Sequence, residues 1–224
     1  MFRDRADAGR RLAAKLKNWP LHDPVVLGIP RGGVAIGAVL ANELGAELDV
    51  VLSRKLRAPG QPELAIGALS ETGAVDLNDR ISQVLDLDDN YLKEEIRTQK
   101  REIARRQRLF RQVRPRASLS DRSVIVTDDG IATGSTMIAA LKVLRQQQPR
   151  EVIVAVPVAT ADRLAEVRPF CDRLMCLLQP ESFLAIGQFY RDFTQLSDTD
   201  VLALLAPRVR EPGPSAQREE ARFH

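Results

Sequence analysis

Short apolar runs alternate with amphipathic segments along most of the chain. Uninterrupted apolar runs predict buried strands at 25–29, 48–53, 123–127, 151–157 and 173–178. Apolar residues at helical spacing predict helices at 4–17, 33–44, 135–147, 161–168 and 198–205. Strands that alternate with helices are typical of a doubly wound, mainly parallel α/β sheet, in which ligands bind at the carboxyl ends of the strands. We therefore predict that fold, with any site at that edge of the sheet.

A long insertion, residues 54–120, separates the second and third of these strands. Its first part predicts a β-hairpin, because strand-like pieces at 64–70 and 74–77 flank a Glu-Thr-Gly turn. Its second part predicts two helices, at 79–86 and 89–113.

Composition is that of a compact enzyme rather than a membrane or nucleic-acid-binding protein. The 224 residues are enough for one buried core, so we predict a single domain, 1–206, and a disordered tail, 207–224. The net charge of +3 is too small to indicate nucleic acid, and no apolar run approaches the roughly 20 residues of a membrane span. The charged N-terminus lacks a signal-peptide core, so a cytoplasmic location is expected. Two cysteines, Cys171 and Cys176, and two histidines cannot assemble a zinc set, and we expect buried thiols.

Residues 124–136 join the end of a strand to a hydroxyl-rich loop. The apolar run ends at Asp128 and Asp129, and the loop 132–136 then opens a helix. Free N–H groups and the helix dipole at such a loop favour an anion, while two carboxylates suit sugar hydroxyls or Mg²⁺. The spacing does not match a Walker A loop or a dinucleotide fingerprint. Two interpretations stay open: a site for a ligand with a phosphate and a polyol or metal, or an ordinary strand–loop–helix with polar cap residues.

A second segment, 25–37, repeats this arrangement. A strand-like run meets the turn Pro30-Arg31-Gly32-Gly33, which is followed by a helix of small and apolar residues. Adjacent glycines let a backbone approach a ligand closely, and an arginine supplies a fork of donors suited to phosphate. Two such loops in one parallel sheet indicate an anion-binding edge more strongly than either loop alone.

Segment 124–136 resembles the signature of the type I phosphoribosyltransferases, which has apolar residues, two acids and a Thr/Gly/Ser/Thr loop. The resemblance implies that Asp128 and Asp129 hold the ribose hydroxyls of phosphoribosyl pyrophosphate (PRPP). It implies Mg²⁺ as cofactor, bound through PRPP, with the same two aspartates as candidate metal contacts. It also implies that the 5′-phosphate lies on Ala132, Thr133, Gly134, Ser135 and Thr136.

The same resemblance assigns the pyrophosphate leaving group to two other segments. In this family the loop equivalent to Arg31, Gly32 and Gly33 binds pyrophosphate, and a flexible lid begins where Arg54 and Lys55 stand. We therefore expect Arg54 and Lys55 to contact pyrophosphate, although solvated charges after a strand are the alternative. The Pro and Gly residues at 59, 60 and 62 suit a mobile lid. The expected catalytic group is Asp128, Asp129, Arg31 and Lys55.

Aromatic residues gather at 183–193, and they are the candidates for contacting the acceptor. Phe183, Phe189 and Tyr190 could stack a planar acceptor, with Asp192 as a hydrogen-bonding partner. Family members build a base-recognising hood near this edge of the sheet, so residues 179–206 are the expected small C-terminal hood. A loop that packs its aromatic rings into the core is the alternative.

Nearly the whole chain resembles a group of stand-alone phosphoribosyltransferases of prokaryotes. The strings that carry this resemblance are Phe2-Arg3-Asp4-Arg5, Ile29-Pro30-Arg31-Gly32-Gly33, Arg54-Lys55, Glu63-Leu64-Ala65-Ile66-Gly67-Ala68 and Phe189-Tyr190-Arg191-Asp192-Phe193. The resemblance implies the fold and the PRPP site but no particular acceptor. Many purine-transferring relatives have Asp where this chain has Ala132, which weakens a purine-salvage role.

The helix at 89–113 and its continuation are strongly basic. Nine Lys or Arg and one acid, Glu102, lie between Arg97 and Arg116. A solvated face, a subunit interface or a basic rim for an anionic substrate, and nucleic-acid contact are all open, although no reading motif accompanies the charge. We predict Mg²⁺-dependent phosphoribosyl transfer from PRPP to a nitrogenous acceptor such as a nucleobase, by a homo-oligomer, with a dimer expected. The alternatives are a PRPP-sensing regulator that binds nucleic acid or a protein partner, and an interaction subunit with a vestigial site.

Overall fold

A computed structural model describes residues 1–77 and 88–206, apart from the side chains of residues 62 and 63. The helix predicted at 79–86 and the tail predicted at 207–224 lie outside the described residues.

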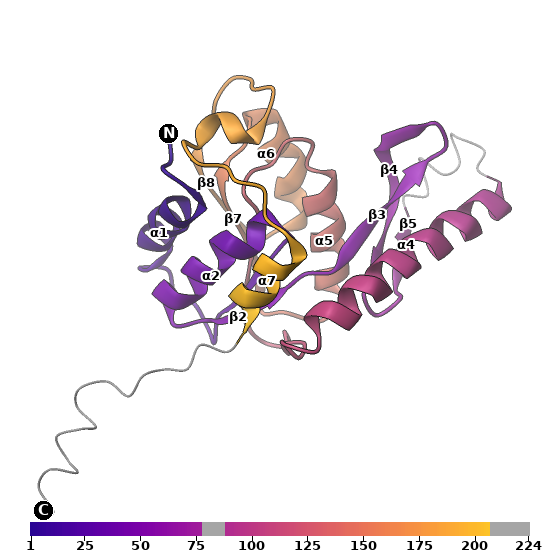
Figure 1. Ribbon diagram of the computed structural model, residues 1–224, viewed down its shortest axis with the longest axis horizontal. Coiled ribbons are helices and arrows are strands. Elements are labelled where there is room, and N and C mark those ends of the chain that lie inside the picture. The colour runs from indigo at the N-terminus through magenta and orange to yellow at the C-terminus, as the bar shows by residue number, and fades with distance from the viewer. Residues whose placement is uncertain (78–87, 207–224) are drawn as a thin grey trace, which may run out of the picture.

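The centre of the molecule is a five-stranded, wholly parallel sheet (Figure 1). Its strands, in the order β2-β1-β6-β7-β8, are Glu47–Val50, Val25–Gly28, Ser123–Thr127, Glu151–Val158 and Arg173–Leu178. Every residue of β1 and β6 is buried, because helices cover both faces of the sheet. The predicted α/β fold with a mainly parallel sheet is therefore confirmed.

Two helical layers enclose this sheet. One face carries α1 (Arg5–Leu16) and α2 (Gly32–Leu44), which pack on Val26, Ile125 and Ile153. The opposite face carries α5 (Ser135–Arg145), α6 (Ala161–Val167) and the 3₁₀ turn η1 (Arg168–Phe170). Alternate residues of each strand point to opposite layers, so the sequence Val25-Val26-Leu27 serves both cores.

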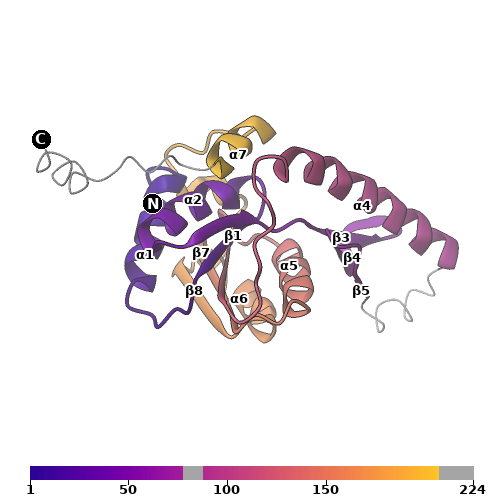
Figure 2. The same ribbon diagram turned by 90° about the horizontal axis from the view of Figure 1, so that it is seen from below.

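The insertion forms an arm that projects from one edge of this body (Figure 2). Its antiparallel sheet consists of β3 (Ser53–Ala58), β4 (Gln61–Ser70) and β5 (Val75–Leu77), and the long helix α4 (Asp89–Phe110) packs along it. Leu56, Ile66 and Ile103 are the buried centre of that contact. The predicted strand at 48–53 is thus wrong in extent, because β2 ends at Val50 and β3 begins a different sheet at Ser53.

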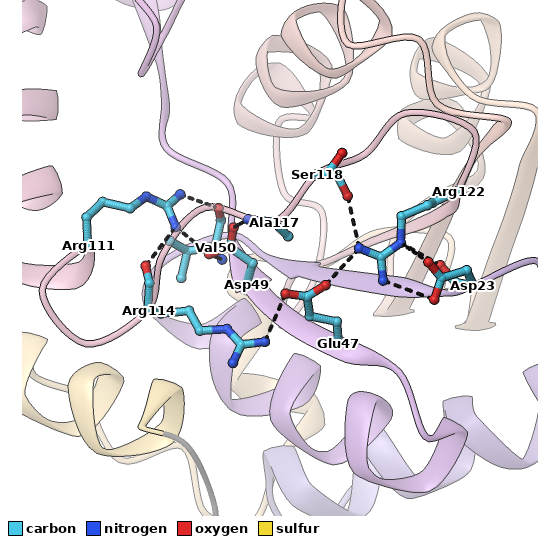
Figure 3. Close-up of polar contacts among 9 residues, drawn as sticks. All are labelled: Asp23, Glu47, Asp49, Val50, Arg111, Arg114, Ala117, Ser118 and Arg122. Carbon is cyan, nitrogen blue, oxygen red and sulfur yellow. Dashed lines mark hydrogen bonds and ion pairs between the residues drawn. The ribbon is translucent and has the colours of Figure 1, made fainter.

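The segment between α4 and β6 forms ion pairs with the acidic side chains of β2 (Figure 3). The Arg111 guanidinium contacts the Asp49 carboxylate at 2.5 Å and the Glu71 carboxylate at 2.7 Å. Glu47 accepts from Arg114 at 3.2 Å and from Arg122 at 2.7 Å. The arm is therefore tied to the sheet by ion pairs as well as by apolar contacts.

The C-terminal segment crosses back over the top of the sheet. It contains the 3₁₀ turn η2 (Ile186–Phe189) and the helix α7 (Asp198–Leu205). Phe2 pairs with Tyr190 through a parallel bridge, and α7 packs on α2 and β2 through Val201 and Leu205. The N-terminal residues and the segment around Tyr190 therefore lie together beside Asp129, just after β6.

Candidate functional site

A cavity of about 550 Å³ opens at the carboxyl ends of β1 and β6. Its lining comes from three places that are distant in sequence: the first turn of α1, the two predicted loops, and the C-terminal segment. The lining residues are Arg5, Pro30, Arg31, Gly32, Asp128, Asp129, Ile186, Phe193, Gln195 and Leu196. The structure therefore brings Arg31 and Gly32 together with Asp128 and Asp129, as the sequence analysis expects of a single site.

Two glycines allow the loops to touch. A Cβ atom on Gly32 would lie 1.9 Å from Oδ2 of Asp129, and one on Gly33 would lie 2.4 Å from the carbonyl oxygen of Thr127. That carbonyl also accepts the N–H of Ile29 at 3.0 Å, and the peptide bond between Pro30 and Arg31 is cis. The absence of side chains at 32 and 33 thus sets how closely the Arg31 loop approaches the aspartates.

The carboxyl groups of Asp128 and Asp129 affect each other's ionisation, and Arg5 forms an ion pair with Asp129. Burial and the neighbouring charge of Asp129 raise the pKa of Asp128 well above its usual range. Burial also raises the pKa of Asp129, but the ion pair with Arg5, at 3.0 Å, opposes this. The Oδ1 atom of Asp128 accepts the N–H of Asp129 at 2.8 Å. The pair can therefore accept hydrogen bonds from hydroxyl groups, and a cation or a developing positive charge placed beside it would favour ionisation of both carboxyls.

The predicted phosphate loop, 132–136, leads into α5 and supplies its first two residues, Ser135 and Thr136. Gly134 is the N-cap of α5 with φ of 77°, a conformation that glycine adopts without strain, and the hydroxyls of Thr133 and Ser135 lie 3.0 Å apart. Ala132, Thr133 and Thr136 are exposed. The free N–H groups of the first turn of α5 therefore face an open surface next to the aspartates, although none of these five residues lines the cavity of 550 Å³.

Arg54 and Lys55 lie on strand β3 rather than in an irregular loop. They line a second cavity of about 200 Å³, which also touches Pro30 and Thr136. The Nε atom of Arg54 donates to Oε1 of Gln99 on α4 at 3.1 Å. The described part of the expected lid thus begins as a regular strand held against a helix, and its charged residues face the region between the two loops.

The aromatic segment meets the cavity through a residue that the sequence analysis does not single out. Phe193 lines the cavity, and the Arg5 guanidinium lies 3.9 Å from its ring centroid. Tyr190 is only 5% exposed, and its hydroxyl donates to the carbonyl oxygen of Asp129 at 2.7 Å. Tyr190 therefore supports the floor of the cavity from below.

The other three acceptor candidates also lie outside the lining. Phe183 and Phe189 pack edge to face, with centroids 5.3 Å apart, and the carboxylate of Asp192 accepts from the backbone and hydroxyl of Thr194. Both hydrogen bonds lower the pKa of Asp192. The residues of the C-terminal segment that reach the cavity are instead Ile186, Phe193, Gln195 and Leu196.

Arg5 is the site residue that sequence reasoning misses most clearly. It belongs to the string Phe2-Arg3-Asp4-Arg5, but nothing in that string shows that α1 crosses the sheet beside Asp129. The pairing of Phe2 with Tyr190, near the opposite end of the described chain, places it there. The only signal for Arg5 in the sequence is that this string resembles the corresponding string of the prokaryotic phosphoribosyltransferase group.

Several arginines of the basic segment are engaged within the molecule. Arg111 bridges Asp49 and Glu71, Arg105 contacts Glu102 and Asp198, and Arg97 contacts Glu94. These contacts favour an intramolecular role for much of the charge over a nucleic-acid surface.

The donor set suits Mg²⁺ held jointly with a ligand. Within residues 1–77 and 88–206, no group of three or more His, Cys, Asp or Glu side chains is placed to enclose a metal ion. Mg²⁺ commonly uses one or two carboxylates together with water and phosphate oxygens, and Asp128 and Asp129 offer two carboxylates beside the cavity.

No helix in the described part of the chain is both long and apolar enough to cross a membrane.

Comparison with known proteins defines the class. Residues 3–194 match the model of the phosphoribosyl transferase domain, and the chain belongs to that family. It is 44% identical over 205 residues to "Putative phosphoribosyl transferase Rv0571c" of Mycobacterium tuberculosis (strain ATCC 25618 / H37Rv), an alignment that covers 92% of this chain and 46% of the relative. The corresponding protein MT0597 of strain CDC 1551 / Oshkosh gives the same values, so the chain spans about half the length of these curated relatives.

One solved structure matches closely. The crystal structure of TT1426 from Thermus thermophilus is 44% identical, with a TM-score of 0.85, and the match covers 91% of this chain and 97% of that one. The fold described above is therefore shared with that structure over most of this chain.

Proposed function

We propose that this chain transfers the phosphoribosyl group of PRPP to a nitrogenous acceptor and releases pyrophosphate in a Mg²⁺-dependent reaction. The observation that carries the proposal is the convergence of Arg31 and Gly32 with Asp128 and Asp129 on one cavity, beside the free N–H groups that open α5. These groups match the parts of PRPP: the N–H groups of α5 suit its 5′-phosphate, the aspartates suit its ribose hydroxyls, and Arg31 suits its pyrophosphate.

The first turn of α5 would hold the 5′-phosphate. Backbone N–H groups of 134–136 and the hydroxyls of Thr133 and Ser135 supply hydrogen-bond donors, and no side chain caps the start of α5. Binding energy gained there is remote from the bond that breaks, so it can fix the position of the ribose relative to the floor of the cavity.

Asp128 and Asp129 would accept hydrogen bonds from the ribose hydroxyls. Their negative charge would also stabilise positive charge that develops on the ribose ring as the bond to pyrophosphate breaks. Arg5 fixes the Asp129 carboxylate, and the Tyr190 hydroxyl fixes the backbone of the same residue, so the pair is oriented before the ligand arrives.

The leaving group would lie between the Arg31 loop and strand β3. Arg31 would neutralise part of its charge, together with Arg54 and Lys55 at the neighbouring cavity. When bound, Mg²⁺ supplies further neutralisation of the phosphate oxygens. The acceptor would enter from the C-terminal side, where Phe193 offers a ring face and Gln195 an amide.

Pyrophosphate release from PRPP tests the proposal. The full chain is assayed with Mg²⁺, with and without a pool of purine and pyrimidine bases, and the pool is then divided to find the acceptor. Release that requires the pool supports transfer. Tight PRPP binding with no release from any pool contradicts it and favours a PRPP-sensing protein.

A further inference from the structure

The second cavity, of about 200 Å³, is lined by an unusual concentration of positive charge. Three elements meet there: the Arg31 loop, strand β3 and helix α4. Its charged lining residues are Arg54, Lys55, Arg57 and Arg106. No carboxylate lines it among the residues whose side chains the structure describes, so the cavity is positive on the side that faces the predicted pyrophosphate loop.

Two of these side chains have buried donors that are not satisfied. The Nε atoms of Arg57 and Arg106 are inaccessible to solvent and have no hydrogen-bond partner among the described atoms. A buried donor without a partner costs about 1–3 kcal/mol. Both guanidinium groups line the cavity, where a phosphate could accept hydrogen bonds from them.

Three acids near this cavity, on α4 and α7, have other partners. Glu95 accepts from the amide of Gln99 at 3.0 Å and from the backbone N–H of Arg57 at 3.1 Å. Glu102 and Asp198 both contact Arg105. Burial and the positive charge of Arg54 lower the pKa of Arg106, although the charges of Asp198 and Glu102 oppose this. The like charges therefore repel one another at a place where an anion would relieve the repulsion.

The second cavity adjoins the main one. Pro30 lines both, and Thr136, from the first turn of α5, lines the second. An extended polyphosphate that leaves the ribose at Asp128 and passes Pro30 enters the second cavity. Arg106 of α4 lines that cavity, and a basic rim for an anionic substrate is one of the roles that the sequence analysis leaves open for this helix.

We propose that Arg106 of α4, assisted by Arg57 of β3, binds the terminal phosphoryl group of the pyrophosphate moiety of PRPP. This inference rests on the proposed function and adds to it a role for the arm: β3 and α4 carry a preformed wall of the pyrophosphate subsite. Ion pairs of Arg111 with Asp49 and of Lys142 with Asp76, the latter at 2.6 Å, join the arm to the sheet and to α5, as such a wall requires.

Three probes separate the subsites in a calorimetric titration of the full chain with Mg²⁺ present. Ribose 5-phosphate reports on the α5 loop and the aspartates, inorganic pyrophosphate reports on the cation-lined cavity, and PRPP reports on both. The variant is Arg106→Gln. The matched control is Arg105→Gln, which removes the same charge from the adjacent position, where the side chain is paired at the surface.

The expected result is that Arg106→Gln weakens binding of pyrophosphate and of PRPP by at least about tenfold, the scale of one charge-assisted hydrogen bond, and leaves ribose 5-phosphate unchanged. Arg105→Gln is expected to stay within about twofold for all three. Equal pyrophosphate affinities for wild type and Arg106→Gln overturn the inference while the proposed function stands. If wild type binds neither ribose 5-phosphate nor PRPP, the proposed function fails and this inference fails with it. Arg106→Lys, which keeps the charge and the aliphatic stem, repeats the comparison if Arg106→Gln does not fold; full pyrophosphate affinity in Arg106→Lys contradicts a role for the guanidinium fork.

Discussion

Replacing Gly33 by alanine should destabilise the fold at the junction of the two loops. The added Cβ would lie 2.4 Å from the carbonyl oxygen of Thr127 and 2.9 Å from Cα of Asp128. Both atoms belong to the backbone of the central strand and its end, so no side chain can rotate away. The loop itself must move, and Gly33 donates its N–H to the carbonyl of Ile29 at 3.0 Å.

The size of the effect follows from that geometry. A Cβ atom closer than 3.0 Å to another heavy atom forces a shift, so the loop must move by roughly 1 Å against a fully buried strand. Overpacking of this kind costs about 1–3 kcal/mol of unfolding free energy. Gly37→Ala is the control, because it lies in the same helix and its Cβ would meet only side-chain ends, the nearest being Leu48 Cδ1 at 3.3 Å.

Urea denaturation of both variants is the assay. Gly33→Ala should lose about 1–3 kcal/mol, whereas Gly37→Ala should change by about 1 kcal/mol or less, since a gain in helix propensity offsets mild crowding. The reasoning is refuted if Gly33→Ala is as stable as wild type, or if Gly37→Ala is destabilised as much.

Three further predictions concern the surroundings of the site. Gly32→Ala should lower PRPP-dependent turnover by about 100-fold in steady-state kinetics, because its Cβ would displace the Asp129 carboxylate. Urea denaturation should show a smaller loss of stability than for Gly33→Ala, because a side chain can move aside. Unchanged turnover argues against this prediction. Arg111→Met should cost about 3–5 kcal/mol in urea near neutral pH, because it strands the buried carboxylate of Asp49. Burial already raises the pKa of Asp49, and removal of the Arg111 charge should raise it further in this variant. Because the folded-state pKa then lies above the unfolded-state value, the loss of stability should be small at acidic pH and should grow as pH rises through the folded-state pKa. A loss of stability that does not depend on pH contradicts this. Tyr190→Phe should cost about 1 kcal/mol, because the Asp129 carbonyl loses a donor at 2.7 Å, and an unchanged urea midpoint would count against that bond.

The sequence predicts the central sheet well because its strands are buried on both faces. Uninterrupted apolar runs such as Val124-Ile125-Val126 mark these strands, and each parallel strand overlaps a predicted run, although β2 ends at Val50 rather than at residue 53. Strand β3 is missed because only Leu56 and Ala58 are buried, and its other residues read as a polar loop. Burial alternates only over 56–58, and Arg54, Lys55 and Arg57 line the second cavity instead of the core.

The two loops were also predictable, whereas the rest of the cavity was not. Arg31, Gly32, Asp128 and Asp129 converge because parallel strands deliver their carboxyl ends to one edge. Arg5 arrives by long-range pairing, and composition cannot tell which aromatic ring of a cluster faces the cavity. Burial decides this, since Tyr190 lies below the floor.

The most direct test of the account is Mg²⁺-dependent pyrophosphate release from PRPP, measured with a pool of bases on wild type and on the double variant Asp128→Asn, Asp129→Asn. The account predicts release by wild type that requires the pool, and no release by the double variant, with the variant still folded by circular dichroism. Turnover close to wild type in the folded double variant would contradict the assignment of these two carboxylates, and with it the central claim.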